Sequence, residues 1–139
     1  MGLRSKAREI SLKVLYQQEI SKCSLDYALE DNLSQIDFPQ EAADFVKYLV
    51  EGVNNKRDEL DKFIAKYALN WDISRMAVVD KNILRLAVYE LVYTDDIPPK
   101  VSINEAVELA KKYGDVDSTK FVNGILDSVY RKEISSKST

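Results

Sequence analysis

The sequence of 139 residues contains no histidine and a single cysteine, Cys23. Without histidine the chain cannot form a Ser-His-Asp or Cys-His catalytic group or a His-ligated zinc site, and one cysteine excludes an internal disulfide and a cysteine-cluster metal site. Glycine and proline are scarce, with four and three residues, which disfavours a β-sandwich built on many tight turns. These shortages favour a helical fold and remove much of the usual enzyme chemistry.

The sequence also lacks a long hydrophobic run. No segment approaches the ~20 apolar residues of a membrane span, and the N-terminus is charged where a signal peptide would be apolar. Hydrophobic residues make up 45% of the chain and charged residues 31%, as in an ordinary soluble domain. We therefore expect one cytoplasmic domain over residues 1–139 that makes no contact with a membrane.

The net charge of −3 is unevenly distributed along the chain. Residues 1–22 contain five basic and two acidic residues, residues 23–62 contain four basic and ten acidic residues, and residues 111–139 contain six basic and four acidic residues. Basic side chains on one exposed face can displace counterions from a nucleic-acid backbone. An ordinary solvated helix face explains the same pattern, so charge alone leaves both interpretations open.

Hydrophobic residues near the N-terminus recur at intervals of three and four, at Leu3, Ala7, Ile10 and Val14. This spacing predicts a helix over about residues 4–20, with Arg4 and Arg8 solvated on the face away from the hydrophobic stripe. Ser24 is a suitable N-cap for a second helix, and Pro39 is suitable as the first residue of a third.

The most hydrophobic stretch begins near Ser74, and its helix must end before the segment 95–99, which closes with two consecutive prolines. Its apolar band is too wide for a surface helix, which predicts a long central helix. Ser102 and Glu105 have the spacing of a capping box for the next helix, Gly114 is a suitable stop, and Ser118 can cap the last helix.

Together these patterns predict an all-α fold of about seven helices. Two helical bundles, over about residues 1–70 and 71–139, pack around the central helix, because each half alone is near the lower size limit for a stable core. The acidic pair at 95–96 lacks a base, a nucleophile or a second carboxylate cluster, and no glycine-rich phosphate loop is present. We therefore expect a protein with no catalytic residue, no metal and no cofactor.

The segment from Lys111 to Phe121 combines a basic helix end, a loop, a helix start and aromatic residues. Such a corner can bind single-stranded RNA, with Lys120 and the helix N-terminus holding phosphate and Phe121 or Tyr113 offering a stacking face. The alternative is that both rings pack in the core, and the pattern does not decide between these for Phe121.

Several longer segments resemble one known family. They are ARE at residues 7–9, VLYQ at 14–17, DKNILRLAVYEL at 80–91, IPPKVSINEAVELAK at 97–111 and KFVNGILD at 120–127. This pattern resembles the NusB family of bacterial transcription antitermination proteins over nearly the whole chain. The resemblance implies two three-helix bundles sharing a long central helix and a role that is not enzymatic.

By this resemblance the protein binds the boxA element of ribosomal-operon RNA together with NusE, a small-subunit ribosomal protein, and the complex modifies elongating RNA polymerase with other Nus factors. The resemblance places RNA contacts on Arg4, Lys6, Arg8, Asp117, Lys120 and Phe121. Among these, Asp117 is expected to temper affinity by repelling phosphate. It places the NusE contact on Tyr16 and Asp80.

Two other functions remain open at this point. A related domain binds RNA in ribosomal RNA cytosine methyltransferases, although this chain has no methyltransferase half. The protein could also be a helical self-association module, because some relatives form homodimers that cover the RNA surface.

Overall fold

The computed structural model describes residues 2–69 and 71–135, which form seven α-helices and no strand. The helices are α1 (Leu3–Ser21), α2 (Leu25–Leu33), α3 (Gln40–Asn55), α4 (Arg57–Tyr67), α5 (Val78–Tyr93), α6 (Pro99–Tyr113) and α7 (Ser118–Val129). A 3-10 turn, Ile73–Arg75, precedes α5, and a π-helical turn, Tyr130–Ile134, follows α7. The all-helical prediction is confirmed. No helix in these described ranges is long and apolar enough to cross a bilayer.

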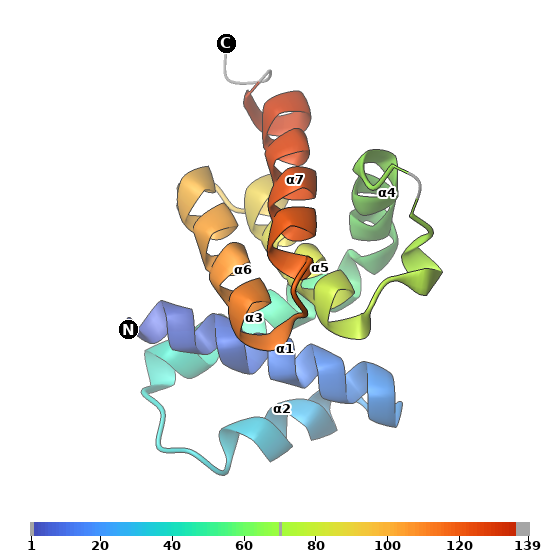
Figure 1. The fold of residues 1–139 in the computed structure, drawn as a ribbon. Helices are drawn as coiled ribbons and strands as arrows, with labels where there is room; N and C mark the ends of the chain where they lie inside the picture. Colours follow the sequence, from blue (N-terminus) through green and yellow to red (C-terminus); the bar gives the residue numbers. More distant parts are fainter. Residues whose placement is uncertain (1, 70, 136–139) are drawn as a thin grey trace.

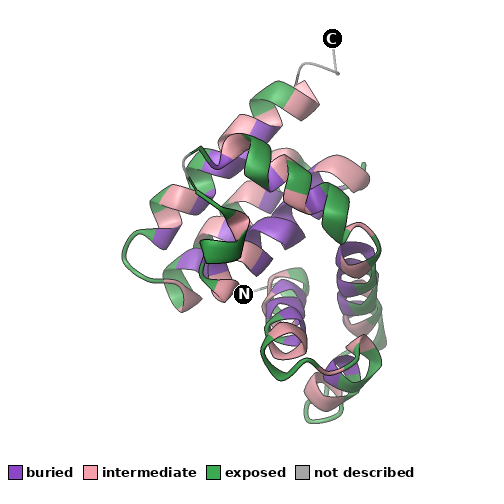
Figure 2. Ribbon diagram, turned by 90° about the vertical axis from the view of Figure 1, so that its right-hand side faces the viewer, coloured by how far each residue is buried: buried purple, intermediate pink, exposed green. Residues whose placement is uncertain are grey.

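Helix α5 lies at the centre of the molecule and contacts α1, α3, α4, α6 and α7. Every residue from Asn82 to Leu91 is buried, which explains the wide apolar band in the sequence. On one side α1 packs with α2 and α3, and on the other α5 packs with α4, α6 and α7 (Figure 1). Helix α4, which a division at residue 70 assigns to the first bundle, packs mainly on α5 and α7. Buried residues lie on the helix faces turned towards neighbouring helices (Figure 2).

Several predicted helix ends are confirmed by their hydrogen bonds. The Ser24 hydroxyl accepts the Tyr27 amide at 3.1 Å and caps α2. The Gly114 amide donates to the Ala110 carbonyl at 2.9 Å, where α6 ends. Because both devices need only a few adjacent residues, local sequence was sufficient to locate them.

Other helix starts differ from the prediction. Helix α5 begins at Val78 and not near Ser74, because the Asp72 carboxylate accepts the Ser74 amide at 3.0 Å and holds a separate 3-10 turn. Helix α3 begins one residue after Pro39. In the last helix Asp117 is the N-cap, and the predicted cap, Ser118, instead accepts the Asp115 amide at 2.9 Å.

The predicted capping box at Ser102 and Glu105 is wrong. Helix α6 begins three residues earlier, at Pro99, because proline suits the first helical position, where no amide donor is needed. Ser102 therefore lies inside the helix, where its buried hydroxyl donates to Glu90 Oε1 at 2.8 Å. Glu105 faces α1 and accepts a hydrogen bond from Ser5.

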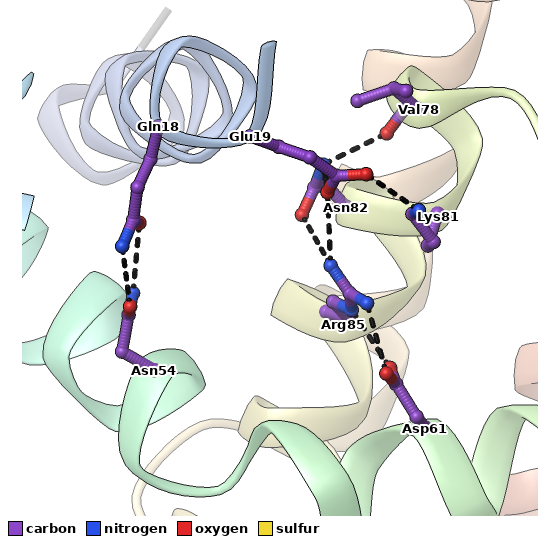
Figure 3. Close-up of polar contacts among 8 residues, drawn as sticks. All are labelled: Gln18, Glu19, Asn54, Asp61, Val78, Lys81, Asn82 and Arg85. Atoms are coloured by element: carbon purple, nitrogen blue, oxygen red, sulfur yellow. Dashed lines mark hydrogen bonds and ion pairs between the residues drawn. The ribbon is translucent and has the colours of Figure 1, made fainter. Parts of the chain in front are cut away.

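The C-terminal end of α1 is fastened to α5 by charged side chains (Figure 3). Glu19 lies 2.6 Å from the Lys81 ammonium and 3.2 Å from the guanidinium of Arg85. The same arginine forms a two-pronged ion pair with Asp61 of α4, at 2.8 and 2.9 Å. Burial raises the pKa of Glu19, but hydrogen bonds from Lys81 and Asn82 outweigh it, so the pKa lies below its usual value. One arginine of α5 thus joins helices from both sides of the molecule.

Replacing Glu19 with glutamine should lower the free energy of unfolding by on the order of 1 kcal/mol at neutral pH. A carboxyl whose pKa is lowered by folding stabilises the protein above its unfolded pKa, and that contribution is lost as the pH falls through the folded pKa. The difference between wild type and variant should therefore shrink as the pH falls from about 5 to about 3. Urea unfolding at several pH values measures it, with exposed Glu51→Gln as the control. A difference that does not change with pH would contradict this account.

Candidate nucleic-acid interface

The first candidate surface is the start of α1. Arg4 and Lys6 are exposed there. The Arg4 guanidinium lies 4.4 Å from the centre of the Phe45 ring and 4.0 Å from Asp96. An exposed ion pair of this length contributes little, so the guanidinium can exchange Asp96 for a phosphate at small cost. The ring beneath it holds the charge at the surface.

The expectation that Arg8 is solvated is wrong. Its side chain is 4% exposed and its guanidinium donates to both carboxylate oxygens of Glu90, at 2.8 and 2.9 Å. A third donor reaches Glu105 Oε1 at 3.4 Å. Arg8 belongs to the buried face of α1, together with Leu12 and Leu15, and its bonds to Glu90 and Glu105 attach that face to α5 and α6. Arg8 therefore holds the N-terminal part of α1 against α5 and α6.

The second candidate surface is the start of α7. Asp117 and Lys120 are exposed, and Lys120 forms no ion pair with any residue that the structure describes. Phe121 is half-buried and packs against the hydrophobic core. Its ring centre lies 5.6 Å from that of Trp71. Both interpretations of Phe121 therefore apply in part, because the ring contacts the core and also reaches the surface.

Tyr113, the other aromatic candidate for stacking, is held between helices. Its hydroxyl donates to Glu9 Oε1 at 2.6 Å, and burial together with this hydrogen bond raises the pKa of Tyr113 to about 12. Lys112 lies 2.9 Å from the same carboxylate oxygen. These bonds attach the second turn of α1 to the end of α6, directly before the loop that leads to α7. Helix α6 thus links the first candidate surface, on α1, to the second, at the start of α7.

The two residues predicted to contact NusE differ in exposure. Tyr16 is 40% exposed and lines a mainly apolar pocket of about 240 Å³ together with Leu12, Lys13, Val79 and Tyr113. Asp80 is only 8% exposed, and its Oδ1 atom has no hydrogen-bond partner in the described part of the chain. Burial raises the pKa of Asp80, and the nearby Asp115 adds to the effect. The pocket therefore presents Val79, and not its neighbour Asp80, beside Tyr16.

The sequence analysis did not identify Trp71 as a candidate site residue. Trp71 is 56% exposed and forms an edge-to-face pair with Phe121, fifty residues away in the sequence. Its local pattern gave no sign of this contact. The one available signal was that the chain contains a single tryptophan, followed by Asp72 and not by a hydrophobic repeat.

The fold and these surfaces define a class of helical proteins with two packed bundles. In this class exposed basic side chains of α1 and α7 lie beside aromatic rings. Comparison with known proteins gives the family. Residues 5–131 match the NusB family, to which the chain belongs. The chain is 46% identical over 132 residues to the transcription antitermination protein NusB of Syntrophus aciditrophicus (strain SB), covering 95% of this chain and 82% of the relative.

Solved structures show the same fold. T. maritima NusB superposes with a TM-score of 0.88 at 36% identity, covering 96% of this chain and 94% of that one. A chain from the crystal structure of antitermination factors NusB and NusE in complex with dsRNA gives a TM-score of 0.84 at 30% identity, covering 93% and 96%.

Proposed function

We propose that this protein is a bacterial transcription antitermination factor that acts in the cytoplasm by assembly and not by catalysis. It binds boxA RNA of ribosomal RNA operons together with NusE, and the complex acts on elongating RNA polymerase with other Nus factors. The observation that carries this proposal is the match over almost the whole chain to the structure of NusB and NusE with dsRNA.

The exposed side chains supply the contacts that such a role needs. Arg4, Lys6 and Lys120 are exposed cations that can each neutralise an RNA phosphate, and Phe121 offers part of a ring for base stacking. Asp117, the N-cap of the helix that carries Lys120, weakens the attraction for phosphate there. Arg8 contributes by holding the α1 backbone in place, because its guanidinium is already bonded to Glu90 and Glu105.

The pocket beside Tyr16 is the proposed NusE surface. Its lining is apolar except for Lys13 and the tyrosine hydroxyls, so a hydrophobic side chain of the partner can fill it. RNA contacts on this chain alone are few, and a bound partner adds its own RNA surface, so the two together bind more tightly than either alone.

Binding to a boxA-like single-stranded RNA should be salt-sensitive and should strengthen when NusE is present. If each of the three exposed cations holds one phosphate, the logarithm of the affinity should fall with the logarithm of the salt concentration with a slope of about −2. Lys6→Ala and Lys120→Ala should each make the slope shallower by about 0.7. Fluorescence anisotropy of labelled RNA over a salt series measures both quantities.

The control is Lys47→Ala, which removes an exposed cation from the distant groove between α2 and α3. It should leave the slope unchanged. Equal affinity for boxA-like and scrambled RNA, with and without NusE, would overturn the proposed function. Sedimentation of the free protein separates that result from a homodimer that covers the RNA surface, because a homodimer would dissociate and regain binding on dilution.

A further inference from the structure

We propose that Trp71 and Phe121 together form a two-ring platform on which one unpaired RNA base stacks. This inference rests on the proposed function, since it concerns the same RNA. It adds a binding residue from the segment between α4 and α5, which lies outside the candidate residues identified from the sequence. The contact between the two rings joins that segment to the start of α7.

The geometry of the ring pair leaves a stacking face open. The ring centres are 5.6 Å apart and the planes meet at 67°, so the two rings meet edge to face and Phe121 does not lie flat on the indole. Trp71 is nevertheless 56% exposed, whereas Phe121 is half-buried with its other contacts in the core. The phenyl ring thus supports the indole from inside, and the free indole face is available to a base.

The segment that carries Trp71 is held in position before any ligand binds. The Trp71 amide donates to the Ala68 carbonyl at 3.1 Å, which closes the chain back on the end of α4. On its other side, the Asp72 carboxylate accepts the Ser74 amide at 3.0 Å and fixes the 3-10 turn. A ring presented on a fixed backbone loses little entropy when it stacks, which favours binding.

The charges around the platform favour RNA over an apolar peptide. Lys120 precedes Phe121 and Arg75 follows Trp71 by four residues; both are exposed, and neither forms an ion pair within residues 2–69 and 71–135. The Ser74 amide and the nearby Arg75 lower the pKa of Asp72, so this carboxylate stays ionised beside Trp71 and offsets part of the attraction for phosphate. Aromatic rings flanked by exposed cations are the combination that single-stranded nucleic acids bind, through base stacking and phosphate attraction together.

The chain contains one tryptophan, so its intrinsic fluorescence reports directly on this platform. The full-length protein with NusE is titrated with a boxA-like RNA, and stacking of a base on the indole should quench the Trp71 emission. In anisotropy titrations Trp71→Ala should weaken RNA binding by about 5- to 100-fold, while Trp71→Phe should retain most of the affinity. Tyr27→Ala removes an exposed aromatic ring from α2 and should leave the affinity unchanged.

The outcomes separate this inference from the proposed function. Specific RNA binding without any change in Trp71 emission, or unchanged affinity in Trp71→Ala while Phe121→Ala binds weakly, overturns the platform and leaves the function standing. Loss of NusE binding in Trp71→Ala with unchanged RNA affinity assigns the ring to a protein contact and also overturns it. Absence of specific binding by the wild type overturns both. If Trp71→Ala does not fold, the emission of the wild type and the affinity of Trp71→Phe decide the question.

Discussion

Replacement of Arg8 by methionine should lower the free energy of unfolding by about 3–5 kcal/mol, the usual cost of leaving one member of a buried ion pair without its partner. Glu90 is 2% exposed and would keep only the hydroxyl of Ser102 as a hydrogen-bond donor. Methionine nearly fills the space of the arginine stem, so the loss reports the charge and not a cavity. Chemical denaturation followed by circular dichroism measures it.

A second substitution tests whether this loss comes from the unpaired carboxylate. Arg8→Met combined with Glu90→Leu removes both charges, and an apolar pair of similar volume is often as stable as a buried ion pair. The double variant should regain most of the lost stability. A double variant no more stable than Arg8→Met would show that the cost lies elsewhere, in the lost contact of Arg8 with Glu105 or in the buried Ser102 hydroxyl, which Glu90→Leu deprives of its acceptor.

The same double variant decides the role of Arg8 in RNA binding. With stability restored and α1 in place, its affinity for boxA-like RNA should match that of the wild type, because Arg4 and Lys6 remain exposed. A clear loss of affinity in the stable double variant would show that Arg8 leaves Glu90 to contact RNA.

Arg8 also shows why periodicity located the helices better than the contacts between them. The spacing correctly identified α1, and Ala7 and Val14 of the predicted stripe are buried, but Leu3 is 53% exposed and Ile10 is only partly buried. It could not show that α1 also packs on α5 and α6, so that the buried face extends to Arg8. The partner of Arg8 lies 82 residues away in α5. Helix ends set by adjacent residues, such as Gly114, were predictable, whereas a buried ion pair between distant helices was not.

The candidate site also contains residues that local sequence reveals and contacts that depend on how distant helices pack. Lys120 was recognisable because exposed cations and helix starts follow from local sequence. The Trp71–Phe121 pair was not, because it depends on how α4 and α7 pack on α5. The burial of Asp80 has the same origin, since the start of α7 lies close enough for Ser118 and Asp115 to affect its pKa.

Gly52 is required by the packing of α3 on α5, and Gly52→Ala should lower the free energy of unfolding by about 2 kcal/mol. A Cβ atom at this position would overlap the end of the Tyr89 ring. That ring cannot swing away easily, because it is itself packed against Tyr48 and Tyr93 at 5.8 and 5.5 Å between ring centres. Alanine also gains about 0.5–1 kcal/mol over glycine inside a helix, but the steric cost exceeds this gain.

Gly124 provides the matched control, because it also lies inside a helix but has open space where a Cβ would be placed. Gly124→Ala should therefore raise the free energy of unfolding by about 0.5–1 kcal/mol, the helix propensity term alone. The two substitutions are chemically identical, so opposite signs in parallel urea titrations isolate the contact with Tyr89. Adding Tyr89→Leu to Gly52→Ala should recover part of the loss, since it removes the ring atoms that the new methyl group meets. If both glycine variants are stabilised equally, α3 shifts away from α5 at little cost, and the close approach of these helices is not required by the fold.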